Sequence, residues 1–60
     1  MNTIIDSDDR IELTVDLPKH QVSRGQQGKV VSIRQPNQLF EVEFENTIIP
    51  VSIRQMKKVG

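Results

Sequence analysis

The sequence predicts an all-β protein in which five short strands curl into a small barrel. Three observations support this fold class. Short runs of Val, Ile, Leu and Phe alternate with polar residues, as strands with one buried face do. Gly, Pro and Asn separate these runs, as they do in turns. The chain has 60 residues and no cysteine, so an apolar core rather than disulfides must hold it together.

A chain of this length forms at most one domain. Residues 1–9 are polar and acidic around one Ile-Ile pair, and we expect a flexible N-terminal tail there, with an extra edge strand as the alternative. Residues 10–60 form the predicted barrel domain. The tail lacks the basic start and apolar run of a signal peptide, and no segment is long and apolar enough to span a membrane. These two observations predict a soluble protein without membrane contact, and the absence of cysteine favours a cytoplasmic location.

The first strand is predicted from Ile11, Leu13 and Val15, which alternate with Glu12, Thr14 and Asp16. The next segment, 16–28, is polar and contains Pro18, Gly25 and Gly28. Proline and glycine both disfavour a helix interior, so this segment is predicted as a long loop.

Residues 29–35 are rich in β-branched side chains and predict a second strand. Pro36-Asn37 follows and favours a hairpin turn, since proline presets the first corner and Asn tolerates the second. In 40–44 Phe and Val alternate with Glu, which predicts a third strand with an apolar inner face and an acidic outer face.

Residues 48–53 predict a fourth strand, in which Pro50 cannot donate to a ladder and therefore indicates an edge position or a bulge. Residues 54–57 suit a short helical turn, and Val59 a brief fifth strand. Curling buries the apolar faces of such short strands and removes exposed edge, so we expect a small SH3-like barrel. The predicted core comprises Ile11, Leu13, Val15, Val22, Val31, Ile33, Phe40, Val42, Phe44, Ile49, Val51, Ile53 and Met56.

The pentapeptide Val-Ser-Ile-Arg-Gln occurs twice, at 31–35 and at 51–55. The residues around the two copies do not match, so convergence of two similar strands explains the repeat better than duplication does. If Val and Ile point inward in both, then Arg34 and Arg54 face outward, and a closed barrel would bring them near one another, which suggests an anion site.

The side chains that catalysis or metal binding needs are sparse. His20 is the single histidine and has no partner ligands at metal-site spacing. The acidic residues Asp6, Asp8 and Asp9 lack the Gly and terminal Glu of a calcium-binding loop. No serine belongs to a nucleophile motif. We therefore predict a protein that is not an enzyme, with no catalytic, cofactor-binding or metal-binding residue.

A protein-interaction module or accessory subunit of a larger complex is the favoured function, because long ordered loops are frequently functional. The partner would be another protein of unknown identity. The candidate partner-binding residues are Leu17, Val22, Arg24, Lys29, Arg34 and Arg54. Homodimerisation through the fourth strand is a further option, since Ile48 and Ile49 cannot both point inward.

The alternative is an RNA-binding module, contacting RNA through basic side chains along one edge: Lys19, Arg24, Lys29, Arg34, Lys57 and Lys58. Eight basic residues are balanced by eight acidic ones, so the strong positive field of a dedicated nucleic-acid binder is missing. Both phenylalanines are assigned to the core, which leaves no aromatic side chain to stack on bases.

Four runs resemble a family of small bacterial, often cyanobacterial, proteins known only as a domain of unknown function. They are Leu-Thr-Val-Asp-Leu-Pro at 13–18, Arg-Gly-Gln-Gln-Gly-Lys-Val-Val at 24–31, Phe-Glu-Val-Glu-Phe at 40–44 and Gln-Met-Lys-Lys-Val at 55–59. The resemblance implies an SH3-like barrel and assigns no activity. Residues 24–33 also resemble the KOW motif of ribosomal and transcription-elongation proteins, which implies that the alternative RNA-binding module is associated with the ribosome or the transcription machinery. The Gly-rich turn of this motif is, however, a requirement of the barrel itself.

Overall fold

The computed structural model describes residues 4–59, and within them it contains five strands and two single-turn 3-10 helices. In chain order these are β1 Arg10–Leu13, η1 Pro18–His20, β2 Gln27–Gln35, β3 Leu39–Phe44, β4 Thr47–Ser52, η2 Ile53–Gln55 and β5 Met56–Val59. The predicted all-β class, the long loop after the first strand and the short helical turn before the last strand are all confirmed.

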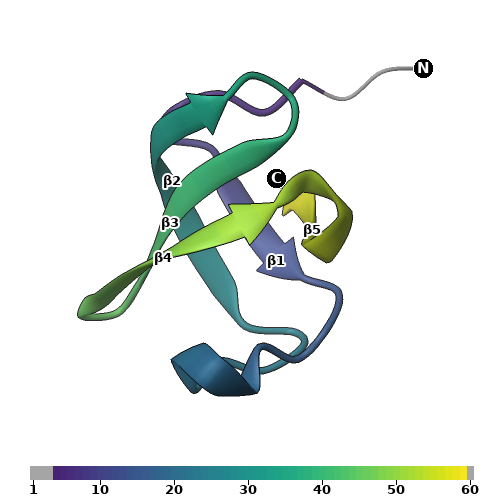
Figure 1. The fold of residues 1–60 in the computed structure, drawn as a ribbon, viewed down its shortest axis with the longest axis vertical. Helices are drawn as coiled ribbons and strands as arrows, with labels where there is room; N and C mark the ends of the chain where they lie inside the picture. The colour runs from purple at the N-terminus through teal and green to yellow at the C-terminus, as the bar shows by residue number, and fades with distance from the viewer. Residues whose placement is uncertain (1–3, 60) are drawn as a thin grey trace.

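The five strands form one antiparallel sheet in the order β4-β3-β2-β1-β5. The sheet curls on itself, so that β4 passes in front of β1 in the view of Figure 1. Within the described residues no ladder joins β4 to β5. The predicted barrel is therefore open between its two edge strands, and Pro50 lies on one of them, as its missing N–H requires.

The core lies inside the curl and is built from apolar side chains of all five strands. Its buried members are Ile5, Ile11, Leu13, Val22, Val30, Phe40, Val42, Phe44, Ile49, Val51 and Met56. Phe40, which pairs with Ile33 on one side and Val51 on the other, has 0% exposure. The third strand, predicted from its Phe-Glu alternation, is confirmed.

The predicted core is wrong at three residues, which are exposed, and a fourth residue is only partly buried. Val15 is 39% exposed because β1 ends at Leu13, so the inward and outward alternation of side chains along the strand does not extend to Val15. Val31 is also 39% exposed and Ile33 36%, whereas the unpredicted Val30 is fully buried. The pairing of β2 with β3 shifts between Val30 and Ser32, and such a bulge changes which residues face inward. Ile53 is half-buried and packs on the core from η2.

The segment before β1 packs against the domain. The side chain of Ile5, which the predicted core omitted, is only 4% exposed. Asp8 N–H donates to Val30 O at 2.7 Å and Val30 N–H donates to Asp9 O at 2.9 Å, so this segment extends the β1–β2 ladder. Flexibility of the predicted tail 1–9 stays a prediction, and residues 1–3 and 60 lie outside the described residues.

A turn at Asp6–Asp9 brings the segment back over the sheet. The Asp9 carboxylate accepts the Asp6 N–H at 2.8 Å and lies 3.4 Å from Lys58 Nζ. The hydrogen bond from the Asp6 N–H is the largest influence on the Asp9 carboxyl and lowers its pKa; desolvation opposes it, and the Lys58 ammonium lowers the pKa further. The turn is thus tied to β5.

Turn residues occupy the backbone conformations expected of them. The hairpin turn at Pro36-Asn37 is confirmed: Asn37 has φ 62° and Gln38 N–H donates to Gln35 O at 2.9 Å.

Gly28 lies on β2, where a Cβ would come within 2.8 Å of Glu43 O and Phe44 Cε1. Only glycine lets β2 lie this close to β3 and to the ring that fills the end of the core.

Candidate functional site

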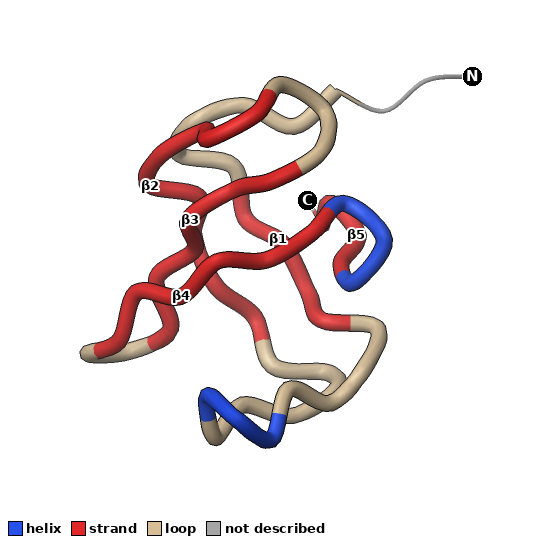
Figure 2. The backbone as a smooth tube through the Cα atoms, viewed as in Figure 1, coloured by secondary structure: helices blue, strands red, loops and turns tan. Residues whose placement is uncertain are grey.

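The long loop after β1 is an ordered structure that presents η1. Leu17 N–H donates to Val22 O at 2.9 Å, which closes the base of the 3-10 turn. Pro18 occupies its first turn, where a missing N–H costs nothing, and Gln21 ends it with φ 60°. Further along, the Asp16 carboxylate accepts the Arg24 N–H at 2.8 Å. The loop therefore holds η1 in a fixed position below the sheet, as Figure 2 shows.

A shallow hollow of about 290 Å³ lies between η1, β4 and η2. It is lined by Leu17, Pro18, Lys19, His20, Pro50 and Gln55. Its apolar lining comes from Leu17 and the two prolines, and its polar groups lie around them. Pro18 and Pro50 are both exposed in the free protein.

The apolar surface continues along β4. Ile48 and Pro50 are alternate residues of this strand and therefore lie on the same face. Ile48 is 55% exposed, among the largest exposures of an apolar side chain in the described residues. We call the set Leu17, Pro18, Lys19, His20, Ile48, Pro50 and Gln55 the η1 surface. It combines an apolar strip with one lysine and one imidazole at its margin.

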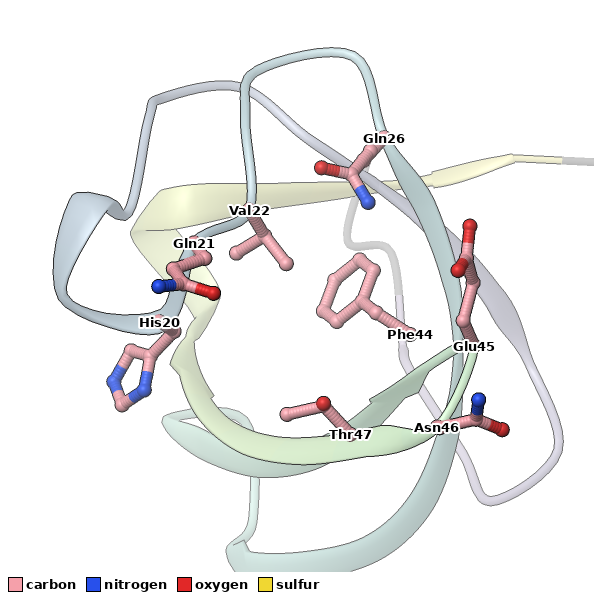
Figure 3. Close-up of a pocket in the computed structure, with 8 residues that line it drawn as sticks. All are labelled: His20, Gln21, Val22, Gln26, Phe44, Glu45, Asn46 and Thr47. Carbon is pink, nitrogen blue, oxygen red and sulfur yellow. The ribbon is translucent and has the colours of Figure 1, made fainter.

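A second hollow, of about 350 Å³, lies on the other side of η1, between it and the β3–β4 hairpin. Figure 3 shows Val22 and Phe44 pointing into it, with amide and hydroxyl side chains around the opening and His20 turned outward. The polar residues around the opening are Gln21, Gln26, Glu45, Asn46 and Thr47. Both hollows include His20 in their lining, so they meet at η1.

The structure does not gather the six predicted site residues into one place. Leu17 lines the first hollow and Val22 the second, so the two apolar candidates flank η1. Arg54 lies on η2 and lines a separate hollow with Leu39, at the opposite end of β4 from the hairpin. Arg34 Nη1 instead pairs with Glu41 Oε2 at 3.1 Å. The guanidinium groups of Arg34 and Arg54 therefore have different surroundings. The anion site that the repeated pentapeptide suggested stays a prediction.

Half of the basic side chains are paired with carboxylates. The pairs are Lys29–Asp8, Arg34–Glu41, Lys57–Glu12 and Lys58–Asp9, at 3.4, 3.1, 3.8 and 3.4 Å. Acidic groups therefore interrupt the basic edge that the sequence suggested for RNA. Each pair is partly exposed and contributes little to stability, but each removes positive potential from the surface.

Sequence reasoning missed Pro18 and Pro50 as members of a surface. Pro50 was interpreted only as a residue of an edge strand or a bulge, and Ile48 was connected only with a homodimer through the fourth strand. Pro50 lies against η1 because the curl of the sheet brings β4 to the loop that follows β1, and Ile48 lies on the same face of β4 as Pro50. The signal available in the sequence was Ile48-Ile49-Pro50, in which only one of the two isoleucines can point inward, next to a proline.

Within residues 4–59 no helix has the length and apolar character needed to cross a membrane. In the same part of the chain, no three His, Cys, Asp or Glu side chains are grouped as metal ligands would be.

Comparison with known proteins gives one match. The family model described as "Domain of unknown function (DUF4926)" matches residues 8–47. The comparisons with curated proteins and with solved structures found no match. The matched region includes β1, the η1 loop, β2 and β3, and it ends at the first residue of β4. It therefore contains Leu17 and Pro18 but neither Ile48 nor Pro50.

Proposed function

This protein belongs to the family described as Domain of unknown function (DUF4926), and because that description names no activity, we propose a function from its surface. The protein is a non-enzymatic interaction module, or an accessory subunit of a larger complex, that docks onto another protein through the η1 surface. The observation that carries this proposal is the apolar strip formed by Leu17, Pro18 and Pro50 of the first hollow together with the exposed Ile48 on the same face of β4.

The strip has the features of a small docking site. Contiguous exposed apolar side chains mark interaction surfaces more often than isolated ones do. The prolines are already rigid, so little conformational entropy is lost when a partner covers them. Lys19 and His20 stand at the margin and favour a carboxylate on the partner. The expected occupant is therefore a protein segment with an apolar side chain next to an acidic one.

Three further parts of the proposal concern the setting of the protein. We propose a bacterial source, a cytoplasmic location and kinship of the fold with SH3-like barrels. The strand order, the long loop after β1 and the 3-10 turn before β5 support the last of these.

The test is a quantitative pull-down from native lysate with the purified protein, Ile48→Glu and Ile4→Glu. Ile48 is 55% exposed and lies on the η1 surface, whereas Ile4 is 61% exposed and lies in the N-terminal segment. Both substitutions change an exposed Ile to the same acid, so neither should unfold the domain. The proposal requires a protein that wild type and Ile4→Glu retain and Ile48→Glu loses, in the presence of nuclease and at high salt.

Equal retention by the three proteins would refute docking through the η1 surface. Capture of nucleic acid that nuclease or added salt removes would instead support the alternative, a KOW-like RNA-binding module.

One observation favours that alternative. Arg10, Lys19, Arg24 and Arg54 form no ion pair within the described residues and remain available to phosphate groups. Phosphate contacts release counterions, so binding to RNA should weaken steeply as salt is raised, while apolar docking should not. An Arg24→Ala variant should lower the salt dependence of RNA binding if this alternative holds.

A further inference from the structure

Four residues other than glycine have a positive φ in the described part of the chain, and two of them border the second hollow. Asp8 and Asn37, with φ 72° and 62°, are of the types that tolerate this left-handed conformation. The other two are Gln21, with φ 60°, and Glu45, with φ 53°. Both line the hollow between η1 and the β3–β4 hairpin. The two less tolerant residue types are therefore found at one place on the surface.

A smaller residue is usual at each of these two positions. Gln21 is the C-cap of η1, and a left-handed residue at a helix end is most often Gly or Asn. Glu45 is the first residue of the two-residue turn between the paired residues Phe44 and Thr47, where Asn, Asp or Gly is favoured. The fold alone does not require a long side chain at either position. Backbone strain of this kind is frequent at ligand sites.

The second hollow has a fixed apolar floor and one oriented donor. Val22 and Phe44 form the floor, and both belong to the buried core. Gln26 stands beside the floor, and its Oε1 accepts the Ser23 N–H at 2.8 Å. This hydrogen bond leaves the Gln26 Nε2 as a donor toward the hollow, as Figure 3 shows.

The charge of the hollow comes from Glu45. None of the described residues that line it is Lys or Arg, and His20 is turned outward (Figure 3). The Glu45 side chain is exposed and takes part in no ion pair within residues 4–59. Glu12 and Glu41, by contrast, are paired with basic side chains. The lining therefore favours a positively charged group.

An arginine side chain has the groups that this lining complements. Its methylene stem can cover Val22 and Phe44, as the stems of long basic side chains do on apolar surface. Its guanidinium carries several N–H donors in a planar fork, which suits the carboxylate of Glu45 together with the carboxamide oxygen of Gln21. The main-chain carbonyl of the same arginine can accept the Gln26 Nε2.

We propose that the second hollow binds an arginine side chain of a partner protein, with the guanidinium on Glu45 and Gln21. The hollow is an open depression of about 350 Å³, whereas free small molecules are usually bound in pockets that enclose most of their surface. An arginine carried by a protein makes its remaining contacts outside the hollow. The proposal does not depend on docking at the η1 surface, which shares only His20 with this lining.

The binding test uses a capped Gly-Arg-Gly tripeptide as the probe. The matched control has citrulline in place of arginine, because citrulline is a neutral side chain of nearly the same shape. Amide chemical shifts of the intact protein are followed by NMR. At millimolar concentration the arginine peptide should shift the amides of Val22, Glu45 and Thr47, and the citrulline peptide should bind at least about tenfold more weakly.

Substitutions at Glu45 separate a ligand role from a structural one. Glu45→Gly removes the carboxylate and relieves the backbone, so it should weaken peptide binding at least about tenfold while the melting temperature stays the same or rises. Glu45→Gln keeps the length of the side chain and should lose the same binding at an unchanged melting temperature. Asn37→Gly makes the corresponding backbone change in the β2–β3 hairpin and should leave peptide binding unchanged.

Four results would overturn the proposal. The first is equal affinity for the arginine and citrulline peptides. The second is unchanged peptide binding by Glu45→Gly. The third is a marked fall in the melting temperature of Glu45→Gly, which would show that the fold itself needs this side chain. The fourth is no shift at the hollow with the arginine peptide at millimolar concentration. None of these results bears on docking at the η1 surface, which the Ile48→Glu pull-down tests.

Discussion

Two identical pentapeptides in this protein adopt different structures. The first Val-Ser-Ile-Arg-Gln copy, at 31–35, lies wholly within β2. The second, at 51–55, completes β4 and then forms η2. Val31 is 39% exposed, whereas Val51 is fully buried. Since the five residues are the same, the difference must come from what surrounds them.

The neighbours of each copy explain its conformation. The first copy is followed by the Pro36-Asn37 turn, which returns the chain so that β3 pairs with it. The second copy follows Pro50 on an edge strand, and the chain must then cross to β1. There Ser52 and Gln55 form a capping box, with the Ser52 hydroxyl accepting Arg54 N–H at 3.2 Å. The same Ser and Gln in β2 have no helical turn to cap.

The largest expected effect concerns Phe40, which lies between the two copies and pairs with Ile33 of one and Val51 of the other. Phe40→Ala should lower the free energy of unfolding by about 3–5 kcal/mol, because the side chain is fully buried. That loss is comparable with the whole stability of many small domains. Chemical denaturation monitored by circular dichroism measures it, and near-native stability would contradict the shared core position.

Matched valine substitutions compare the copies directly. Val51→Ala removes fully buried methyl groups and should cost about 2 kcal/mol. Val31→Ala should cost less than about 0.5 kcal/mol, because this side chain is exposed to solvent at a bulge in β2. Urea denaturation of the two variants gives both values. Equal costs would show that the copies are buried alike in solution.

The glutamines provide a smaller contrast. Gln55→Ala removes the acceptor of Ser52 N–H and should destabilise the domain by about 1 kcal/mol. Gln35→Ala, its counterpart in the first copy, is at an exposed position and should change the stability by less than about 0.5 kcal/mol. Thermal unfolding of both variants measures the contrast. If Gln35→Ala were the more damaging change, the capping box would not stabilise the second copy.

A fall in pH should produce the smallest effect on stability. The group concerned, Asp9, lies outside both copies of the pentapeptide. The folded-state pKa of Asp9 is lowered, so its contribution to stability is present above the unfolded pKa and is lost as pH falls through the folded value. The turn that places Ile5 should loosen in that range while Val51 stays packed. Methyl shifts of the two residues followed against pH test this, with Asp9→Asn as the control that abolishes the Ile5 transition.

Local patterns predicted most elements of the fold. The alternation of Phe, Val and Glu in 40–44 identified β3, and Pro50 limited its strand to an edge position or a bulge, because period-2 burial and a missing donor are properties of the residues themselves. The site was predicted less well. Leu17 and Val22 were found from the loop, but Pro50 reaches the loop only through the curl of the sheet, and Ile48 lies on the same face of β4.

By itself, the sequence determined the all-β class, the positions of the turns and the choice between an edge position and a bulge at Pro50, because backbone sterics and strand periodicity act over a few residues. Only the tertiary structure decided that Val30 rather than Val31 points inward, and that one pentapeptide is strand while its twin ends in a helical turn. The physical reason is that register and burial depend on the strand across the ladder, which a short stretch of sequence does not contain.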